Sequence, residues 1–471
     1  MKNKKIKNKI KPMKPATRTL IAHDRKYLWH PFTQMSAWIE KGPVIIIEKA
    51  KGCTLIDTDG NRYLDGVSSL WCNVHGHRVK KIDNAIRKQL ARVAHTTLLG
   101  LGSPPSIKLA KMLIESAPKG LTRVFYSDDG ATAVEAALKI ALQYHIQTGH
   151  PEKRVFAGLY NAYHGDTIGA VSVGGMDSFH GIFAPLRFET IKIPSPYCYR
   201  CPENMEREKC SMECVKKAEE IIEKNQKKLA ALIMEPLVQG AAGMIVHPEG
   251  YLKKIREICE RNSVLFIADE VATGFGRTGA LFACDVENVT PDIMCLAKGI
   301  TGGYLPLAAT IATEKIFEAF LGSPESQRAF LHGHTYTGNA LACSAAIESL
   351  KLLRKKVMPE LPQKINLVSS LLEEKIKPLE NVGDIRQKGL MIGIELVENK
   401  KTKSPFPPQA LMGRKVTLRA IEKGVFLRPL SDIIVLMPPL TISMEEIEFL
   451  INATKEAIKE TIHNEKENAG K

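Results

Sequence analysis

The chain has 471 residues, of which 44% are hydrophobic and 25% charged, and its 66 lysines and arginines against 51 acidic residues give a formal net charge of +15. This length predicts two domains of about 100–250 residues each. No apolar run approaches the roughly 18 residues that a membrane helix requires, and no apolar segment near the start is typical of a secretory signal. We therefore expect a cytoplasmic globular protein without a membrane partner.

Part of the positive charge lies at the start of the chain, where residues 1–14 contain seven lysines. Such a segment can bind nucleic acid through phosphate contacts. Binding of single strands also uses aromatic side chains between the charges, and the first aromatic residue is Tyr27. We therefore predict a flexible basic leader over residues 1–20 and no nucleic-acid partner.

Alternating helices and strands dominate the middle of the chain. Residues 44–57 predict a hairpin that turns at Lys51-Gly52. Beyond residue 75, amphipathic patterns predict helices at 105–117, 132–147, 213–225 and 250–261, and apolar runs predict strands at 123–127, 154–158, 229–234, 264–268 and 292–297. Continuous apolar strands between amphipathic helices indicate an α/β fold with a mostly parallel sheet covered on both faces. Ligands of such sheets bind at the carboxyl ends of the strands.

The pattern changes after residue 345. A long charged helix is expected at 345–378, followed by strands at 389–396, 425–428 and 433–437. The last helix begins with a capping box, Ser443-x-x-Glu446. We predict a large domain over 75–345 and a small α+β domain formed by 346–471 together with 21–74.

The most informative pair is Asp269 and Lys298. One apolar strand ends at Asp269, a glycine-rich connection over 273–279 follows, and the next apolar strand leads directly to Lys298. Either residue alone is typical of a polar loop at a strand end. Together they are what pyridoxal phosphate enzymes need, because an aspartate keeps the pyridine nitrogen protonated and a lysine binds the cofactor covalently.

Other segments offer weaker signals, each with a structural alternative. Gly130 and Ala131 start a helix after a strand, where backbone N–H groups favour a phosphate. Tyr163 follows another strand and either stacks on a flat ring or belongs to the core. Thr335 lies in a polar loop that either contacts a phosphate or caps the next helix. Arg428, between apolar neighbours, either binds a carboxylate or lies on the surface.

Four of the ten cysteines form a cluster in the sequence, Cys198-x-x-Cys201 and Cys210-x-x-x-Cys214. This spacing is compatible with zinc. The alternative is a surface loop with reduced thiols, which fits the six scattered cysteines elsewhere and a reducing compartment. We predict no metal cofactor and leave the cluster's role open.

Three segments together resemble the class III, fold-type I pyridoxal phosphate aminotransferases: DEVATGFGRTG at 269–279, AKGITGGYLPLAAT at 297–310 and HGHTYTGNALACSAA at 332–346. The resemblance spans about residues 25–440. Within that class, LWHPFTQM at 28–35, SSLWCNVHG at 68–76, Ala272 and LMPPL at 436–440 are similar to the members that aminate 8-amino-7-oxononanoate in biotin synthesis.

The resemblance implies a role for each matching residue. Lys298 would bind the cofactor and shuttle the proton, and Asp269 would pair with the pyridinium nitrogen. Tyr163 would stack on the ring, and Gly130 and Ala131 would hold the phosphate. It also implies a homodimer whose sites lie at the interface, with Thr335 reaching the phosphate of the partner subunit.

The substrate side of the site is also implied by the resemblance. Trp71, Gly333 and Arg428 would line it, together with Tyr163 and Lys298, and Arg428 would bind the carboxylate of 8-amino-7-oxononanoate. The expected reaction is a ping-pong transamination. Another class III reaction, on a diamine, ornithine or 4-aminobutyrate, is the nearest alternative, and a non-catalytic protein that keeps the fold is a more distant one.

Two positions depart from the family pattern. Ala131 stands where a serine is usual, which removes a hydroxyl that Thr132 could replace. Phe32 stands where members that use S-adenosylmethionine carry a tyrosine near the substrate pocket. The amino donor is therefore either S-adenosylmethionine or lysine.

Overall fold

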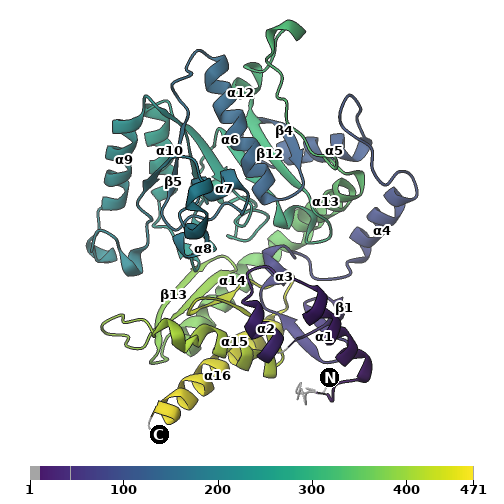
Figure 1. The fold of residues 1–471 in the computed structure, drawn as a ribbon, viewed down its shortest axis with the longest axis vertical. Helices are drawn as coiled ribbons and strands as arrows, with labels where there is room; N and C mark the ends of the chain where they lie inside the picture. The colour runs from purple at the N-terminus through teal and green to yellow at the C-terminus, as the bar shows by residue number, and fades with distance from the viewer. Residues whose placement is uncertain (1–10, 43, 470–471) are drawn as a thin grey trace.

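The computed structural model describes residues 11–42 and 44–469. Figure 1 shows two tiers, an upper one built on a seven-stranded sheet and a lower one that contains both ends of the described chain. The order of the large sheet is β4-β12-β11-β10-β7-β5-β6. Its strands are β4 (Leu121–Ser127), β5 (Val155–Leu159), β6 (Thr190–Ile193), β7 (Leu229–Met234), β10 (Leu265–Asp269), β11 (Ile293–Leu296) and β12 (Ala308–Thr313).

The large sheet is mostly parallel, as predicted. β10 pairs in parallel with β11 and β7, and β5 pairs in parallel with β7 and β6. β12 is antiparallel to both β11 and β4. All residues of β7, β10 and β11 are buried, which explains why these strands are continuous apolar runs.

Helices cover both faces of this sheet, as predicted. Ile267 belongs to a core cluster with the α6 residues Ala133 and Ala137. The neighbouring Phe266 points the other way into a second cluster that includes Ala346 of α13. The helices of this tier are α4 (Lys80–Leu90), α5 (Pro104–Ile114), α6 (Gly130–Gln147), α7 (Ile168–Val173), α8 (Asp177–His180), α9 (Glu213–Asn225), α10 (Tyr251–Arg261), α11 (Ala283–Val286), α12 (Glu314–Glu318) and α13 (Ala340–Leu352).

The lower tier contains two four-stranded sheets, ordered β1-β2-β3-β15 and β13-β14-β17-β16. In the first, β15 runs parallel to β3 and pairs Val425 with Leu64, so segments from both ends of the chain share one sheet. This supports the predicted small domain, whose boundaries stay a prediction. The strands are β1 (Ile47–Lys51), β2 (Thr54–Asp57), β3 (Arg62–Asp65), β13 (Val382–Lys388), β14 (Met391–Leu396), β15 (Val425–Phe426), β16 (Arg428–Leu430) and β17 (Ile433–Leu436), and a separate pair is β8 (Val238–Gln239) with β9 (Ile245–Val246).

Helices of the lower tier flank these sheets. The predicted long helix is present: α13 continues without a break through π-helical turns at Leu353–Val357 and Leu372–Ile376. The predicted capping box is also formed, since Ser443 N–H donates to Glu446 and Glu446 N–H donates to Ser443. These helices are α1 (Pro15–Tyr27), α2 (Met35–Lys41), α3 (Ser68–Trp71), α14 (Met358–Leu371), α15 (Met412–Glu422) and α16 (Met444–Ala469).

The predicted flexible leader over 1–20 needs a correction. Helix α1 already begins at Pro15, and Asp59 accepts hydrogen bonds from the Lys14 N–H at 2.8 Å and the Thr17 hydroxyl at 2.7 Å. A lysine-rich composition does not reveal such contacts with a distant turn, so the prediction of a flexible leader is wrong for residues 11–20. Residues 1–10 lie outside the described part of the chain. No described helix is long and apolar enough to span a membrane.

Candidate active site

A cavity of about 760 Å³ lies at the carboxyl ends of β4, β5, β10 and β11. Six residues predicted from the sequence line it together, contributed by three strand ends, the start of α6 and the α3 segment. They are Trp71, Gly130, Ala131, Tyr163, Asp269 and Lys298. Side chains that are far apart in the sequence thus lie together at this edge of the sheet. Trp71 and Lys298, the most distant pair, are 227 positions apart.

Lys298 lies two residues after the end of β11 and adopts the left-handed backbone conformation, with φ of 38°. Such a conformation costs about 1–3 kcal/mol for a residue other than glycine and persists only where its surroundings enforce it. The Nζ atom lies 5.5 Å from the centroid of the Trp71 ring. Burial lowers the pKa of the Lys298 amine, opposed mainly by the charge of Asp269, and this lowering favours the neutral form that can accept a proton.

Asp269 is fixed by two partners at the end of β10. One carboxylate oxygen accepts the Val271 N–H at 3.0 Å, and the other lies 2.7 Å from Nδ1 of the fully buried His164. The sequence reasoning missed His164, although it directly follows Tyr163. Nε2 of His164 is buried without a hydrogen-bond partner. A hydrogen bond from His164 Nδ1 holds the carboxylate in place.

Tyr163 is held through both its backbone and its side chain. Its N–H donates to Glu235 Oε2 at 3.1 Å, and its hydroxyl donates to Asp166 Oδ2 at 2.7 Å. Its ring is stacked on that of His180 at 5.7 Å, and His180 Nε2 lies 3.1 Å from the other Asp166 oxygen. Burial raises the pKa of the Tyr163 phenol, with Asp166 adding to it, so Tyr163 is a protonated donor with a fixed ring at neutral pH.

The start of α6 lies at another wall of the cavity. A Cβ on Gly130 would lie 2.6 Å from Val271 Cγ1, so only glycine fits there without movement of the valine. The Asp129 carboxylate accepts the Thr132 N–H at 3.0 Å, and the Thr132 hydroxyl bonds the Asp129 N–H and carbonyl in return. The Thr132 hydroxyl is therefore engaged in capping, and the suggestion that it replaces the missing serine hydroxyl is not supported.

Glu235 is a second residue that the sequence reasoning missed. It follows β7, the neighbour of β10, and its two oxygens accept the N–H groups of Tyr163 and Gly240 at 3.1 and 2.9 Å. Burial, reinforced by the charge of Asp269, raises its pKa from 4.5 to about 8. Glu235 is therefore mostly protonated at neutral pH and adds little negative charge beside Asp269.

This raised pKa predicts a distinctive pH dependence of stability in the cofactor-free protein. The folded state keeps a proton that the unfolded state releases near pH 4.5, so wild-type stability falls as pH rises from about 4.5 to about 8 and levels off above. Glu235→Gln loses one backbone hydrogen bond at every pH but does not titrate. Thermal denaturation should therefore show a deficit in the melting temperature of Glu235→Gln relative to the wild type, and this deficit should narrow between pH 5 and pH 8. A deficit that stays constant with pH would contradict the protonated state.

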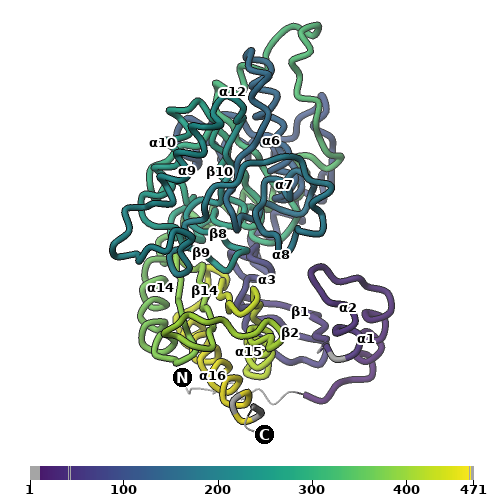
Figure 2. The backbone as a smooth tube through the Cα atoms, turned by 60° about the vertical axis from the view of Figure 1, so that its left-hand side comes forward, coloured from purple at the N-terminus to yellow at the C-terminus, as the bar shows by residue number. Residues whose placement is uncertain are grey.

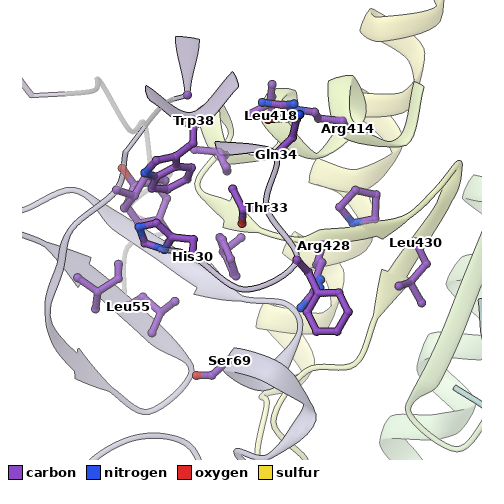
Figure 3. Close-up of a pocket in the computed structure, with 18 of the residues that line it drawn as sticks. His30, Thr33, Gln34, Trp38, Leu55, Ser69, Arg414, Leu418, Arg428 and Leu430 are labelled. Atoms are coloured by element: carbon purple, nitrogen blue, oxygen red, sulfur yellow. The ribbon is translucent and has the colours of Figure 1, made fainter. Parts of the chain in front are cut away.

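A second cavity of about 1270 Å³ adjoins the first and contains Arg428 (Figure 3). The Arg428 guanidinium lies 5.7 Å from the centroid of the Phe32 ring, and Phe32 lies 5.7 Å from Phe179. Phe179 in turn meets Tyr163 edge to face at 6.5 Å. A line of aromatic rings therefore leads from Tyr163 in the first cavity to a guanidinium suited to a carboxylate.

Two of the predicted site residues line neither cavity. Gly333 and Thr335 are exposed in the loop that precedes α13, and neither is among the residues that line the two cavities. The Thr335 carbonyl accepts a hydrogen bond from His95 Nε2 at 2.7 Å. Their contribution to a site in a partner subunit stays a prediction.

The four clustered cysteines lie in the segment that leads into α9. Cys198, Cys201 and Cys210 are half-buried, and Cys214 is buried. The Cys210 thiol donates to Glu213 at 3.2 Å. Among residues 11–42 and 44–469, no group of three or more His, Cys, Asp or Glu side chains is arranged to hold a metal ion. The role of the four cysteines stays open.

Known proteins resemble this chain over nearly its whole length. The model of the family Aminotransferase class-III matches residues 36–458. The adenosylmethionine-8-amino-7-oxononanoate aminotransferase of Nitratidesulfovibrio vulgaris is 54% identical over 445 residues, 94% of this chain and 82% of that protein. The protein of the same name from Geobacter sulfurreducens is 52% identical over 444 residues, 94% of this chain and 98% of that protein.

A solved structure agrees with these sequence matches. The crystal structure of adenosylmethionine-8-amino-7-oxononanoate aminotransferase from Methanocaldococcus jannaschii superimposes with a TM-score of 0.90 at 46% identity, covering 94% of this chain and 99% of that one. The family match over residues 36–458 includes the cavity residues from Trp71 to Arg428 described above, while Phe32 precedes it. This chain therefore belongs to the class III aminotransferases, a family of pyridoxal phosphate-dependent transaminases.

Proposed function

We propose that this enzyme aminates 8-amino-7-oxononanoate to 7,8-diaminononanoate in biotin synthesis, using pyridoxal phosphate. The observation that carries the proposal is the placement of Asp269 and Lys298 in one cavity, from which a line of aromatic rings leads to Arg428 in the second cavity. The names of the relatives support this acceptor and point to S-adenosylmethionine as the donor. Lysine is the alternative donor, because Phe32 stands where a tyrosine is usual.

The residues present fit pyridoxal phosphate. The N–H groups of Gly130 and Ala131 at the start of the 18-residue helix α6 suit its phosphate. The fixed Asp269 carboxylate suits its protonated ring nitrogen, and the buried amine of Lys298 suits the covalent link. When bound, the cofactor supplies an electron sink for the carbon that carries the transferred amine.

Each side chain then has a definite task. Lys298, with its lowered pKa, would accept the proton from the substrate carbon that carries the amine and would donate it back as the amine is transferred. Asp269 stabilises the positive charge on the ring nitrogen throughout, an electrostatic role that requires no movement. Arg428 binds the substrate carboxylate and thereby orients the reacting end toward Lys298.

Replacing Arg428 should separate binding from chemistry. Arg428→Ala removes a charged hydrogen-bonding group worth about 1.5–3 kcal/mol, so KM for 8-amino-7-oxononanoate should rise about 10- to 100-fold while kcat changes little. Arg428→Lys keeps the charge but loses the planar fork, and should give an intermediate KM. Steady-state kinetics with a saturating donor measure both. An unchanged KM in Arg428→Ala would place the carboxylate elsewhere.

A substrate panel tests the proposed function itself. Purified enzyme with pyridoxal phosphate is offered S-adenosylmethionine or lysine as donor, and 8-amino-7-oxononanoate, pyruvate, 2-oxoglutarate or succinic semialdehyde as acceptor, and each product is quantified. We expect the highest kcat/KM with 8-amino-7-oxononanoate. A clear preference for one of the other acceptors would instead indicate a diamine, ornithine or 4-aminobutyrate aminotransferase.

We also propose a homodimer in which Thr335 and Gly333 complete the partner's site. The loop that carries them exposes apolar side chains, with Leu331 93% and Tyr336 61% exposed, as is usual for a surface that another chain covers. If Thr335 acts across the interface, Lys298→Ala and Thr335→Val subunits should complement each other in a hybrid dimer, since one of its two sites has both residues. Activity of mixed and refolded subunits measures this. A mixture no more active than its components would mean that Thr335 serves its own subunit.

A further inference from the structure

The Asp24 carboxylate, in the last turn of α1, contacts residues on both sides of the loop that carries Phe32. The Asp24 carboxylate oxygens lie 3.1 and 3.0 Å from His30 Nε2, and one of them accepts the Trp38 indole N–H at 2.8 Å. The His30 and Trp38 rings also contact each other, with centroids 4.5 Å apart. His30 and Trp38 lie side by side in Figure 3. Asp24, only 8% exposed, is therefore the common acceptor of this triad.

The loop between the two anchors presents Phe32 to the substrate cavity. Phe32 has φ of 50°, which is unfavourable for a residue with a side chain, and its side chain is 57% exposed. A strained and exposed aromatic residue keeps its position only if the surrounding chain enforces it. Phe32 contacts Phe179 and the Arg428 guanidinium, each at 5.7 Å.

Figure 2 shows α1 and α2 beside β1 and β2, at a distance from the large sheet. The loop thus extends from a peripheral layer toward Arg428, and its geometry depends on local anchors. The other end of α1 has its own anchor, where Asp59 accepts from Lys14 and Thr17. Asp24 and Asp59 therefore hold opposite ends of one helix, and only Asp24 is bonded to the Phe32 loop.

We propose that Asp24, with His30 and Trp38, is a positioning device for substrate recognition: it holds Phe32 against Arg428 and so fixes the guanidinium that receives the substrate carboxylate. This rests on the proposed role of Arg428. Asp24 touches neither substrate nor cofactor and acts through Phe32. Its loss should weaken binding of the carboxylate more than it slows the chemistry on the distant amine.

The test compares Asp24→Asn with a matched control, Asp59→Asn, which removes the carboxylate that anchors the other end of α1. Asp24→Asn should raise KM for 8-amino-7-oxononanoate about tenfold with kcat lowered less than twofold, whereas Asp59→Asn should leave KM unchanged. Trp38→Phe, which removes only the N–H donor, should shift KM in the same direction as Asp24→Asn. In a Phe32→Ala background, adding Asp24→Asn should change KM less than twofold. A tenfold effect that persists in that background, or an equal effect of Asp59→Asn, would overturn the proposal.

Binding of nonanoate, a nine-carbon carboxylate without reactive groups, separates this proposal from the proposed function. Its affinity is measured by calorimetry on the cofactor-loaded enzyme. Weaker binding to Asp24→Asn, but not to Asp59→Asn, would support the positioning role even if 8-amino-7-oxononanoate were not a substrate. Equal binding to wild type and Asp24→Asn would reject that role whatever the acceptor is.

Discussion

Lys298→Ala should abolish turnover, with kcat reduced at least about 10⁴-fold, while the protein stays folded. The loss combines covalent catalysis with proton transfer, and proton transfer alone contributes about 10²–10⁴-fold. Stability should not fall, because the amine is buried at an energetic cost that lowers its pKa. Steady-state kinetics and thermal denaturation measure the two effects.

Lys153 provides the control, since it is also a buried lysine whose pKa is lowered by burial. Its amine donates to the carbonyls of Gln226 and Ser263, each at 2.9 Å, away from the cavity. Lys153→Ala should therefore lower stability and retain turnover, the reverse of Lys298→Ala. A Lys298→Ala enzyme with near-normal kcat would refute the assigned role.

Asp269→Asn should lower kcat about 10²- to 10³-fold, the range found when one preorganised electrostatic group is removed. Asparagine matches aspartate in shape, and its carbonyl can still accept the Val271 N–H. It cannot balance the charge of a protonated ring nitrogen. The variant should also hold the cofactor more weakly, which is measured by titrating the cofactor-free protein with pyridoxal phosphate.

Asp292→Asn is the matched substitution just before β11, the strand beside β10, at the opposite edge of the sheet from Asp269. Asp292 accepts the Phe266 N–H at 2.8 Å and pairs with Arg256 at 2.8 Å, without lining the cavity. Its loss should affect stability and leave kcat nearly unchanged. Similar kcat losses in the two variants would mean that Asp269 supports the sheet rather than the reaction.

Much of the fold could be predicted because the spacing of apolar residues along the chain follows which side chains are buried. The strands at 229–234 and 264–268 are apolar at nearly every position since both faces are covered, and the structure confirms them. Strand β12 was missed because three of its six residues, Ala-Ala-Thr-Ile-Ala-Thr, are alanines, which are depleted in strands. It forms because it pairs on both sides, a long-range condition that local sequence does not encode.

The site was predictable where chemistry singles out a residue at a strand end. Asp269 and Lys298 stood out as such, and the structure brings them into one cavity. Glu235 follows a buried strand in the same way but was passed over, since only the strand order places β7 beside β10. His164 and Asp24 escaped notice because their roles depend on partners 105 and 14 residues away.

The most direct test of the account is to follow the two half-reactions on one sample. The visible absorbance of the cofactor-loaded enzyme is recorded after S-adenosylmethionine or lysine is added, and again after 8-amino-7-oxononanoate is added. We predict that one donor removes the absorbance and that the keto acid restores it, with 7,8-diaminononanoate formed in equal amount. Absorbance that a donor removes and only a different keto acid restores would contradict the proposed acceptor.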